Sequence, residues 1–239
     1  MKQLDLLKEL EVLEKHKKAK EEHRKFVDFM HPHFGLNERP KYCEIRMRPL
    51  WAMGLYGDGK IYVSNSHRYG LRSNAFTTWH ESSHFLHFHR NQLYSAELKR
   101  KIKREESYSD DEFTVNETVA NLGAFIYLEK KFGLSQQNII KYAFADHDET
   151  NIDEMLSLVI ALRDKSLLAK IAALTANEAM KLIQPYKEEA DLYLNSLCKK
   201  QIPSKDFEKD SDFSFRGKSY FPQVSPADRL DISQVEFDF

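Results

Sequence analysis

The spacing of apolar residues changes several times along the chain, and each change marks a different predicted element. Residues 3–30 carry apolar side chains at helical spacing with Lys and Glu between them, which predicts one long amphipathic helix ending at Pro32. Its apolar positions are Leu6, Leu10, Leu13, Phe26, Phe29 and Met30. Because this repeat fades between His16 and Arg24, we expect the helix to pack on the domain. The alternative is a coiled-coil or partner-binding helix.

Residues 40–66 lose the helical repeat and alternate over short runs instead. Strands are predicted at Tyr42–Met47, Trp51–Tyr56 and Ile61–Val63. Between the second and the third lies Gly57-Asp58-Gly59, whose residues favour a tight turn, so these two strands predict a hairpin. We therefore expect a small antiparallel sheet.

Helical patterns dominate the rest of the chain. The first helix after the strands is predicted from a cap at Ser73 or Asn74 to about Leu93. Ser109 and Glu112 match a capping box, and the helix they start is predicted to end at Phe132, before Gly133. Further helices are predicted from Ser135 to about Ala145 and, with interruptions, from Asn151 to about Leu197. Residues 201–239 predict an extended, partly ordered tail.

Composition and charge narrow the class of protein. The chain has 239 residues, a net charge of −1 and 31% charged residues, so we expect neither membrane attachment nor direct binding to nucleic acid. The only cysteines, Cys43 and Cys198, have no metal-ligand spacing and are expected to be buried thiols. The charged N-terminal segment does not match a signal peptide, and no apolar run approaches a membrane span. Together these features favour the cytoplasm.

The sequence Trp79-His80-Glu81-Ser82-Ser83-His84 contains an HExxH pattern inside a predicted helix. Residues four apart lie on one helix face, so His80 and His84 can bind one metal ion together. Glu81 lies beside that face and is expected to act as general base on a zinc-bound water. The alternative is that both histidines are ordinary residues of a helical scaffold.

Catalytic zinc also requires a third protein ligand, and the candidate is Glu117 on the next predicted helix. Two antiparallel helices can bring it opposite the histidine pair, and its apolar surroundings favour a partnered carboxylate over a surface one. Asn121, one helical turn after Glu117, is placed to hydrogen-bond a ligand imidazole. The sequence thus predicts a zinc site formed by His80, His84 and Glu117.

Other residues are weaker candidates for substrate or oxyanion contacts. His87 lies three residues after His84 and faces roughly toward the metal, where it could also compete as third ligand. His147, between two aspartates, is a candidate donor for the oxyanion. The pattern does not choose among it and the other candidates, which are His67, Tyr69, Tyr108, Tyr142 and Tyr220. The basic run Lys99–Arg104 is either a solvated helix face or a rim for an acidic substrate or nucleic acid.

The segment from Arg72 to His87, followed by Glu117-Thr118-Val119-Ala120-Asn121, resembles the ImmA/IrrE-type metallopeptidases over roughly residues 40–130. Ser82-Ser83 departs from the Leu-Gly usual in that family. The resemblance implies a zincin-like α+β fold, with a small sheet packed on the HExxH helix and the Glu-bearing helix and a helical C-terminal region. The predicted regions are 1–33, an N-terminal helix; 34–133, the zincin-like core; 134–200, the helical C-terminal region; and 201–239, the tail.

The sequence therefore favours a zinc-dependent peptidase that cleaves a protein or peptide substrate in the cytoplasm. The family resemblance implies that this substrate is a DNA-binding transcriptional repressor. The alternative is a regulatory module that keeps the zincin fold but senses metal or sequesters a partner without cleavage. The intact Glu81 favours the enzyme, because a purely structural metal site needs no base.

Overall fold

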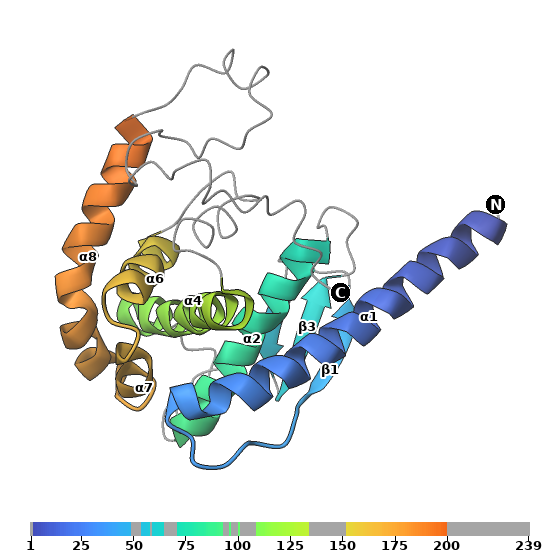
Figure 1. Cartoon of the computed structure of the whole chain (residues 1–239), viewed down its shortest axis with the longest axis horizontal. Helices are drawn as coiled ribbons and strands as arrows, with labels where there is room; N and C mark the ends of the chain where they lie inside the picture. Colours follow the sequence, from blue (N-terminus) through green and yellow to red (C-terminus); the bar gives the residue numbers. More distant parts are fainter. Residues whose placement is uncertain are drawn as a thin grey trace.

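The chain folds as an α+β protein in which a three-stranded sheet lies at one side of a set of packed helices (Figure 1). The computed structural model describes residues 2–48, 54–57, 59–64, 71–92, 96, 100, 109–133 and 152–199. Its elements are α1 (Lys2–Met30), the 3-10 helix η1 (His31–Phe34), β1 (Glu44–Arg48), β2 (Gly54–Gly57), β3 (Lys60–Ser64), α2 (Leu71–Arg90), α4 (Asp110–Phe132), α6 (Ile152–Arg163), α7 (Leu167–Ile171) and α8 (Ala176–Lys199). The predicted α+β class is confirmed.

The sheet is mixed, so the expected antiparallel sheet is wrong in one of its two pairings. β2 and β3 form the predicted antiparallel hairpin, with Tyr56 opposite Ile61. β1 instead pairs parallel to β3, with Ile45 opposite Ile61, which leaves β2 at the edge in the order β1-β3-β2. The turn between β2 and β3 fixes their pairing locally, whereas a parallel partner is joined through chain that lies between, where no turn residue specifies it.

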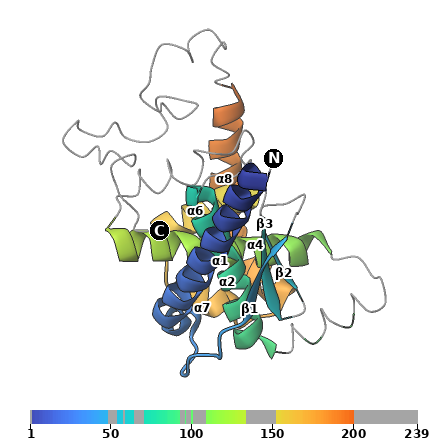
Figure 2. The same cartoon turned by 90° about the vertical axis from the view of Figure 1, so that its right-hand side faces the viewer.

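Helix α1 packs along α2 and β1 and has the predicted length, but its buried face is not the expected one (Figure 2). Leu10 and Leu13 are 54% and 63% exposed, because the N-terminal part of the helix extends beyond the other described elements (Figure 1). The buried face lies further along the helix, and its members are Lys15, Ala19, Glu22, His23, Phe26, Val27 and Met30. Of these, Phe26, Val27 and Met30 join the same core as Trp79 of α2 and Phe125 of α4.

Helices α2 and α4 cross closely and carry the site described below. α2 begins at Leu71, before the predicted cap, while α4 has the predicted capping box between Ser109 and Glu112 and ends before Gly133, whose φ of 61° is left-handed. Where the helices meet, a Cβ added to Gly123 would lie 2.5 Å from the Ser83 hydroxyl oxygen. Two small residues therefore permit this close approach.

Helices α6, α7 and α8 lie against α4 on the side away from the sheet (Figure 1). A capping interaction between Thr175 and Glu178 precedes α8, with both residues donating and accepting across the first turn. The helix predicted from Ser135 to Ala145 and the tail 201–239 lie outside the described residues. Among the described residues, no helix combines the length and the apolar character required to cross a membrane.

Candidate metal centre

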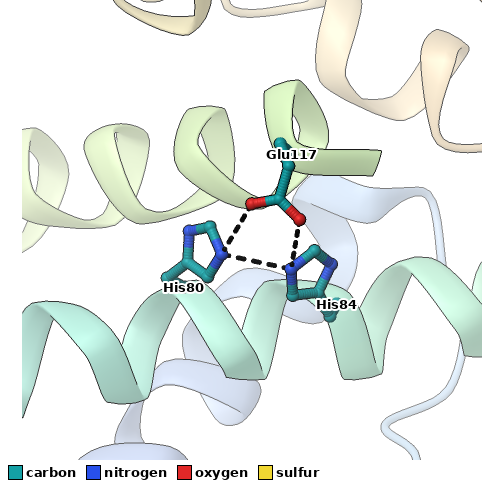
Figure 3. Close-up of side chains that lie close together, drawn as sticks. All are labelled: His80, His84 and Glu117. Carbon is teal, nitrogen blue, oxygen red and sulfur yellow. Dashed lines mark hydrogen bonds and ion pairs between the residues drawn. The ribbon is translucent and has the colours of Figure 1, made fainter. Parts of the chain in front are cut away.

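Three side chains from two helices converge as the sequence predicts. His80 and His84 lie one turn apart on α2, and Glu117 of α4 lies directly across from both (Figure 3). The two Nε2 atoms are 3.1 Å apart, and the Glu117 carboxylate oxygens lie 3.3 Å from Nε2 of His80 and 3.5 Å from Nε2 of His84. These three residues form a group that could hold a metal ion.

Each imidazole is held at its other ring nitrogen by an asparagine of α4. Asn121 Oδ1 lies 2.8 Å from His80 Nδ1, which places this residue where the sequence expects it. Asn116 Oδ1 lies 3.2 Å from His84 Nδ1, a contact that the sequence pattern does not indicate. When each Nδ1–H donates to an amide oxygen, the Nε2 atoms of both rings face the shared centre.

Glu81 is 5% exposed and lies on the side of the site that faces the sheet. The backbone of Tyr56 in β2 hydrogen-bonds its carboxylate, and Gly54 of the same strand lies against its side chain. Burial raises the pKa of the Glu81 carboxyl, while the nearby histidines act in the opposite direction. The candidate base is therefore held between the histidine pair and the edge strand.

The opposite charges of the group shift the pKa values of His80 and Glu117 toward their charged forms. Burial alone would lower the pKa of His80, but the hydrogen bond and charge of Glu117, together with the charge of Glu81, raise it to about 9. Burial would likewise raise the pKa of Glu117, but the charge of His84 and hydrogen bonds from both histidines hold it well below its usual range. A carboxylate and two imidazoles are thus kept in contact in a mostly buried place, and this set of donors could hold a cation.

The opposite side of α2 is tied to α1 by a second buried histidine. The Ser82 hydroxyl donates to the Thr78 carbonyl, so its oxygen accepts from His23 Nδ1 at 2.8 Å. His23 Nε2 in turn accepts from the backbone N–H of Cys43 at 3.3 Å. One turn earlier, Trp79 Nε1 donates to the buried Glu22 at 2.9 Å. Ser82 and Ser83 of the HExxH segment therefore serve packing, one against α1 and the other against Gly123 of α4.

The other candidate residues lie apart from the group or outside the described part of the chain. His87 is 2% exposed, hydrogen-bonds Asn116 and does not belong to the three-residue group. Burial lowers its pKa to about 3, and its role as a substrate contact stays a prediction. The remaining candidates, His147, His67, Tyr69, Tyr108, Tyr142 and Tyr220, lie outside the described residues, as does the basic run except the exposed Arg100.

Of the two cysteines, only Cys43 has a side chain that the structure describes. Cys43 is a free, partly buried thiol, and burial raises its pKa to about 12. The side chain of Cys198 lies outside the described part of the structure.

Comparison with models of known protein families, with curated proteins and with solved structures found no match to this chain.

Proposed function

We propose that this protein is a zinc-dependent metallopeptidase that cleaves a protein or peptide substrate. The observation that carries the proposal is the convergence of His80 Nε2, His84 Nε2 and the Glu117 carboxylate, with Glu81 buried beside them. Two imidazoles and one carboxylate that leave a fourth position open are the ligand set of many catalytic zinc sites.

The distances between the donor atoms favour zinc. A tetrahedral zinc ion with bonds of about 2.0–2.1 Å holds its ligand atoms roughly 3.3–3.4 Å apart. The three separations in this site are 3.1, 3.3 and 3.5 Å. Larger, harder cations such as calcium prefer six or more oxygen ligands, which this set of two nitrogens and one carboxylate does not supply. The donor set and its separations therefore favour zinc over such cations.

The side chains around the centre supply the remaining chemistry. A bound zinc ion would lower the pKa of a coordinated water toward roughly 7 and polarise the scissile carbonyl. Asn121 and Asn116 keep the two imidazoles oriented. Glu81 takes a proton from the attacking water as the C–O bond forms, and it delivers that proton to the amine nitrogen as the C–N bond breaks. The net reaction is hydrolysis, in which one water is added across one peptide bond.

The position of β2 agrees with a peptide substrate. This strand is the edge of the described sheet and contacts Glu81 through Tyr56. An extended peptide can add to a free sheet edge through backbone hydrogen bonds, which would bring its carbonyl groups near the base. We extend the proposal to the zincin-like fold and to the ImmA/IrrE-type resemblance, which implies a DNA-binding repressor as substrate. The fold and the substrate class are inferred from the HExxH motif and from the geometry of the three-residue group.

The test is cleavage by the zinc-loaded protein of a mixture of synthetic peptides of diverse sequence, read by mass spectrometry. The proposal predicts that Glu81→Gln lowers the cleavage rate by about a thousandfold, because general acid–base catalysis contributes roughly 10²- to 10⁴-fold. The same variant should keep its zinc, since Glu81 is not a ligand. Lys20→Ala, an exposed change on α1, is the control and should cleave as the parent does.

A regulatory module without catalysis is the competing outcome of this experiment. It predicts stoichiometric zinc but no cleavage by either the parent protein or the Glu81→Gln variant. If Glu81→Gln cleaves as fast as the parent, the proposed mechanism is wrong even though a metal site is present.

A further inference from the structure

Gly54 lies where β2 meets the HExxH helix, and no side chain would fit there. A Cβ built on Gly54 would lie 2.5 Å from Thr77 Cγ2, 2.8 Å from Glu81 Oε1 and 2.9 Å from Glu81 Cγ. Distances below 3.0 Å are essentially never seen for a real Cβ. Thr77 and Glu81 are each 5% exposed, so neither can turn freely into solvent.

The requirement for glycine at this position is one of space rather than of backbone conformation. The described glycines with positive φ are Gly35, Gly59 and Gly133, and Gly54 is not among them. An alanine could therefore adopt its backbone angles, yet its methyl group would occupy the volume that Glu81 fills. Gly57, three residues later on the same strand, shows the contrast, because no described atom lies within 4 Å of a Cβ added there.

We infer that Gly54 is a positioning residue for Glu81: its missing side chain leaves the space in which β2 holds the carboxylate beside the histidine pair. The atoms nearest to the added Cβ belong to Thr77 and Glu81, and none belongs to a metal ligand. The Tyr56 backbone hydrogen bond to the carboxylate comes from the same short strand. Strand β2 thus positions Glu81 in two ways: Gly54 leaves room for its side chain, and the backbone of Tyr56 hydrogen-bonds its carboxylate. The catalytic consequence of this inference rests on the proposed function.

The first test compares Gly54→Ala with its matched control, Gly57→Ala. A base displaced by about 1 Å can lower a rate by roughly a hundredfold, so Gly54→Ala should lower kcat by about that factor. Its zinc affinity and its KM for the peptide mixture should stay close to those of the parent. Gly57→Ala should match the parent in all three. A loss of zinc in proportion to the loss of rate, or an unchanged kcat, would overturn the inference.

A second variant separates Glu81 from the general spacing of strand and helix. Thr77→Ser removes Cγ2, which is the atom nearest to the added Cβ, and leaves both Glu81 contacts in place. The double variant Gly54→Ala/Thr77→Ser should therefore remain slow. Recovery of the parent kcat would show that Thr77 alone causes the defect, which contradicts a positioning role through Glu81.

A third measurement does not depend on activity. The amide proton of Tyr56, followed by NMR in protein without substrate, should exchange slowly in the parent and in Gly57→Ala. It should exchange faster in Gly54→Ala, because the displaced carboxylate no longer accepts it. If the parent cleaves no peptide, the proposed function fails while this measurement still decides the role of Gly54. An exchange rate that Gly54→Ala leaves unchanged would overturn that role.

If Gly54→Ala does not fold, the pair Gly54→Ala/Glu81→Ala decides the question. Removal of the Glu81 side chain beyond Cβ frees two of the three contacts, so folding should recover. No recovery would place the conflict elsewhere and overturn the inference.

Discussion

Two histidines, His80 and His23, lie on opposite sides of α2, and their pKa values are shifted in opposite directions. On the side of the candidate metal centre, His80 contacts Glu117, and its pKa is raised to about 9. On the side that faces α1, burial and the charge of Arg24 lower the pKa of His23 to about 4, while the charge of Asp28 acts in the opposite direction. The His23 ring contacts Ser82 and the backbone of Cys43, both of which are neutral.

The difference shows that burial alone does not mark a functional histidine. The His23 ring is buried and the His80 ring is mostly buried, but only His80 has a carboxylate and a second imidazole directed at the same point. His23 uses both ring nitrogens to join α1, α2 and the segment before β1, so it has no lone pair left for a ligand. Donor atoms that converge on one point therefore indicate a metal site. A histidine whose two ring nitrogens both have hydrogen-bond partners in the protein indicates a structural role.

The largest effect that separates the two sides is the response to zinc. Zinc at about 1,000 times its dissociation constant should stabilise the folded protein by about 4 kcal/mol, because it binds the folded state alone. His84→Ala should lose this increment, and His23→Ala should keep it on a lower baseline. Thermal or urea unfolding with and without zinc measures both. Equal zinc responses in the two variants would remove the distinction drawn between the two sides.

Loss of His23 itself should affect stability rather than metal binding. His23→Ala removes one buried and one partly buried hydrogen bond and leaves a cavity at the contact of α1 with α2, which predicts a loss of about 3 kcal/mol. Its zinc affinity should change far less than the roughly tenfold to hundredfold loss expected at a residue that holds a ligand. Lys20→Ala, exposed on the same helix, serves as the control for urea unfolding. A His23 variant as stable as this control would contradict the tie between the helices.

Acid should weaken the His23 side selectively. The unfolded chain takes up the His23 proton near pH 6.5, whereas the folded protein takes it up only near pH 4, so stability falls as the pH falls through this window. Relative to neutral pH, the His23 contribution should be lower by about 2 kcal/mol at pH 5. His23→Gln should show a shallower loss over the same range. Parallel stability curves for parent and variant would show that His23 does not carry this dependence.

The smallest effects concern the two asparagines that hydrogen-bond the imidazoles of His80 and His84. Asn121→Ala and Asn116→Ala should each weaken zinc binding by roughly tenfold to hundredfold, measured by competition with a chromogenic chelator. The loss should be larger for Asn121, whose contact is 2.8 Å, than for Asn116, whose contact is 3.2 Å. Full affinity in both variants would mean that helix packing alone orients the rings.

The sequence predicts the metal side of α2 better than the side that faces α1. His80 and His84 follow from spacing within one helix, and Glu117 and Asn121 follow from spacing within the next. Asn116 was missed because it directly precedes Glu117, and neighbours in a helix point in directions about 100° apart. The contact of Asn116 therefore depends on the crossing of α2 and α4, which sequence spacing does not specify.

The contacts of α1 and the sheet order were harder to predict for a related reason. Glu22 and His23 lie in the stretch of α1 where the apolar repeat fades, yet they bond Trp79 and Ser82, far away in the sequence. The hairpin of β2 and β3 was predictable from its turn, while the parallel partner of β3 was not. The roles of Gly54 and Gly123 likewise depend on what packs against them.

The most direct test of the metal centre is the zinc content of the purified protein beside that of Glu117→Ala, measured by elemental analysis after dialysis against trace zinc. The arrangement of His80, His84 and Glu117 predicts about one zinc ion per chain in the parent and only a small fraction of that in the folded variant. A parent protein that takes up no stoichiometric zinc, or a variant that retains as much as the parent, would contradict it.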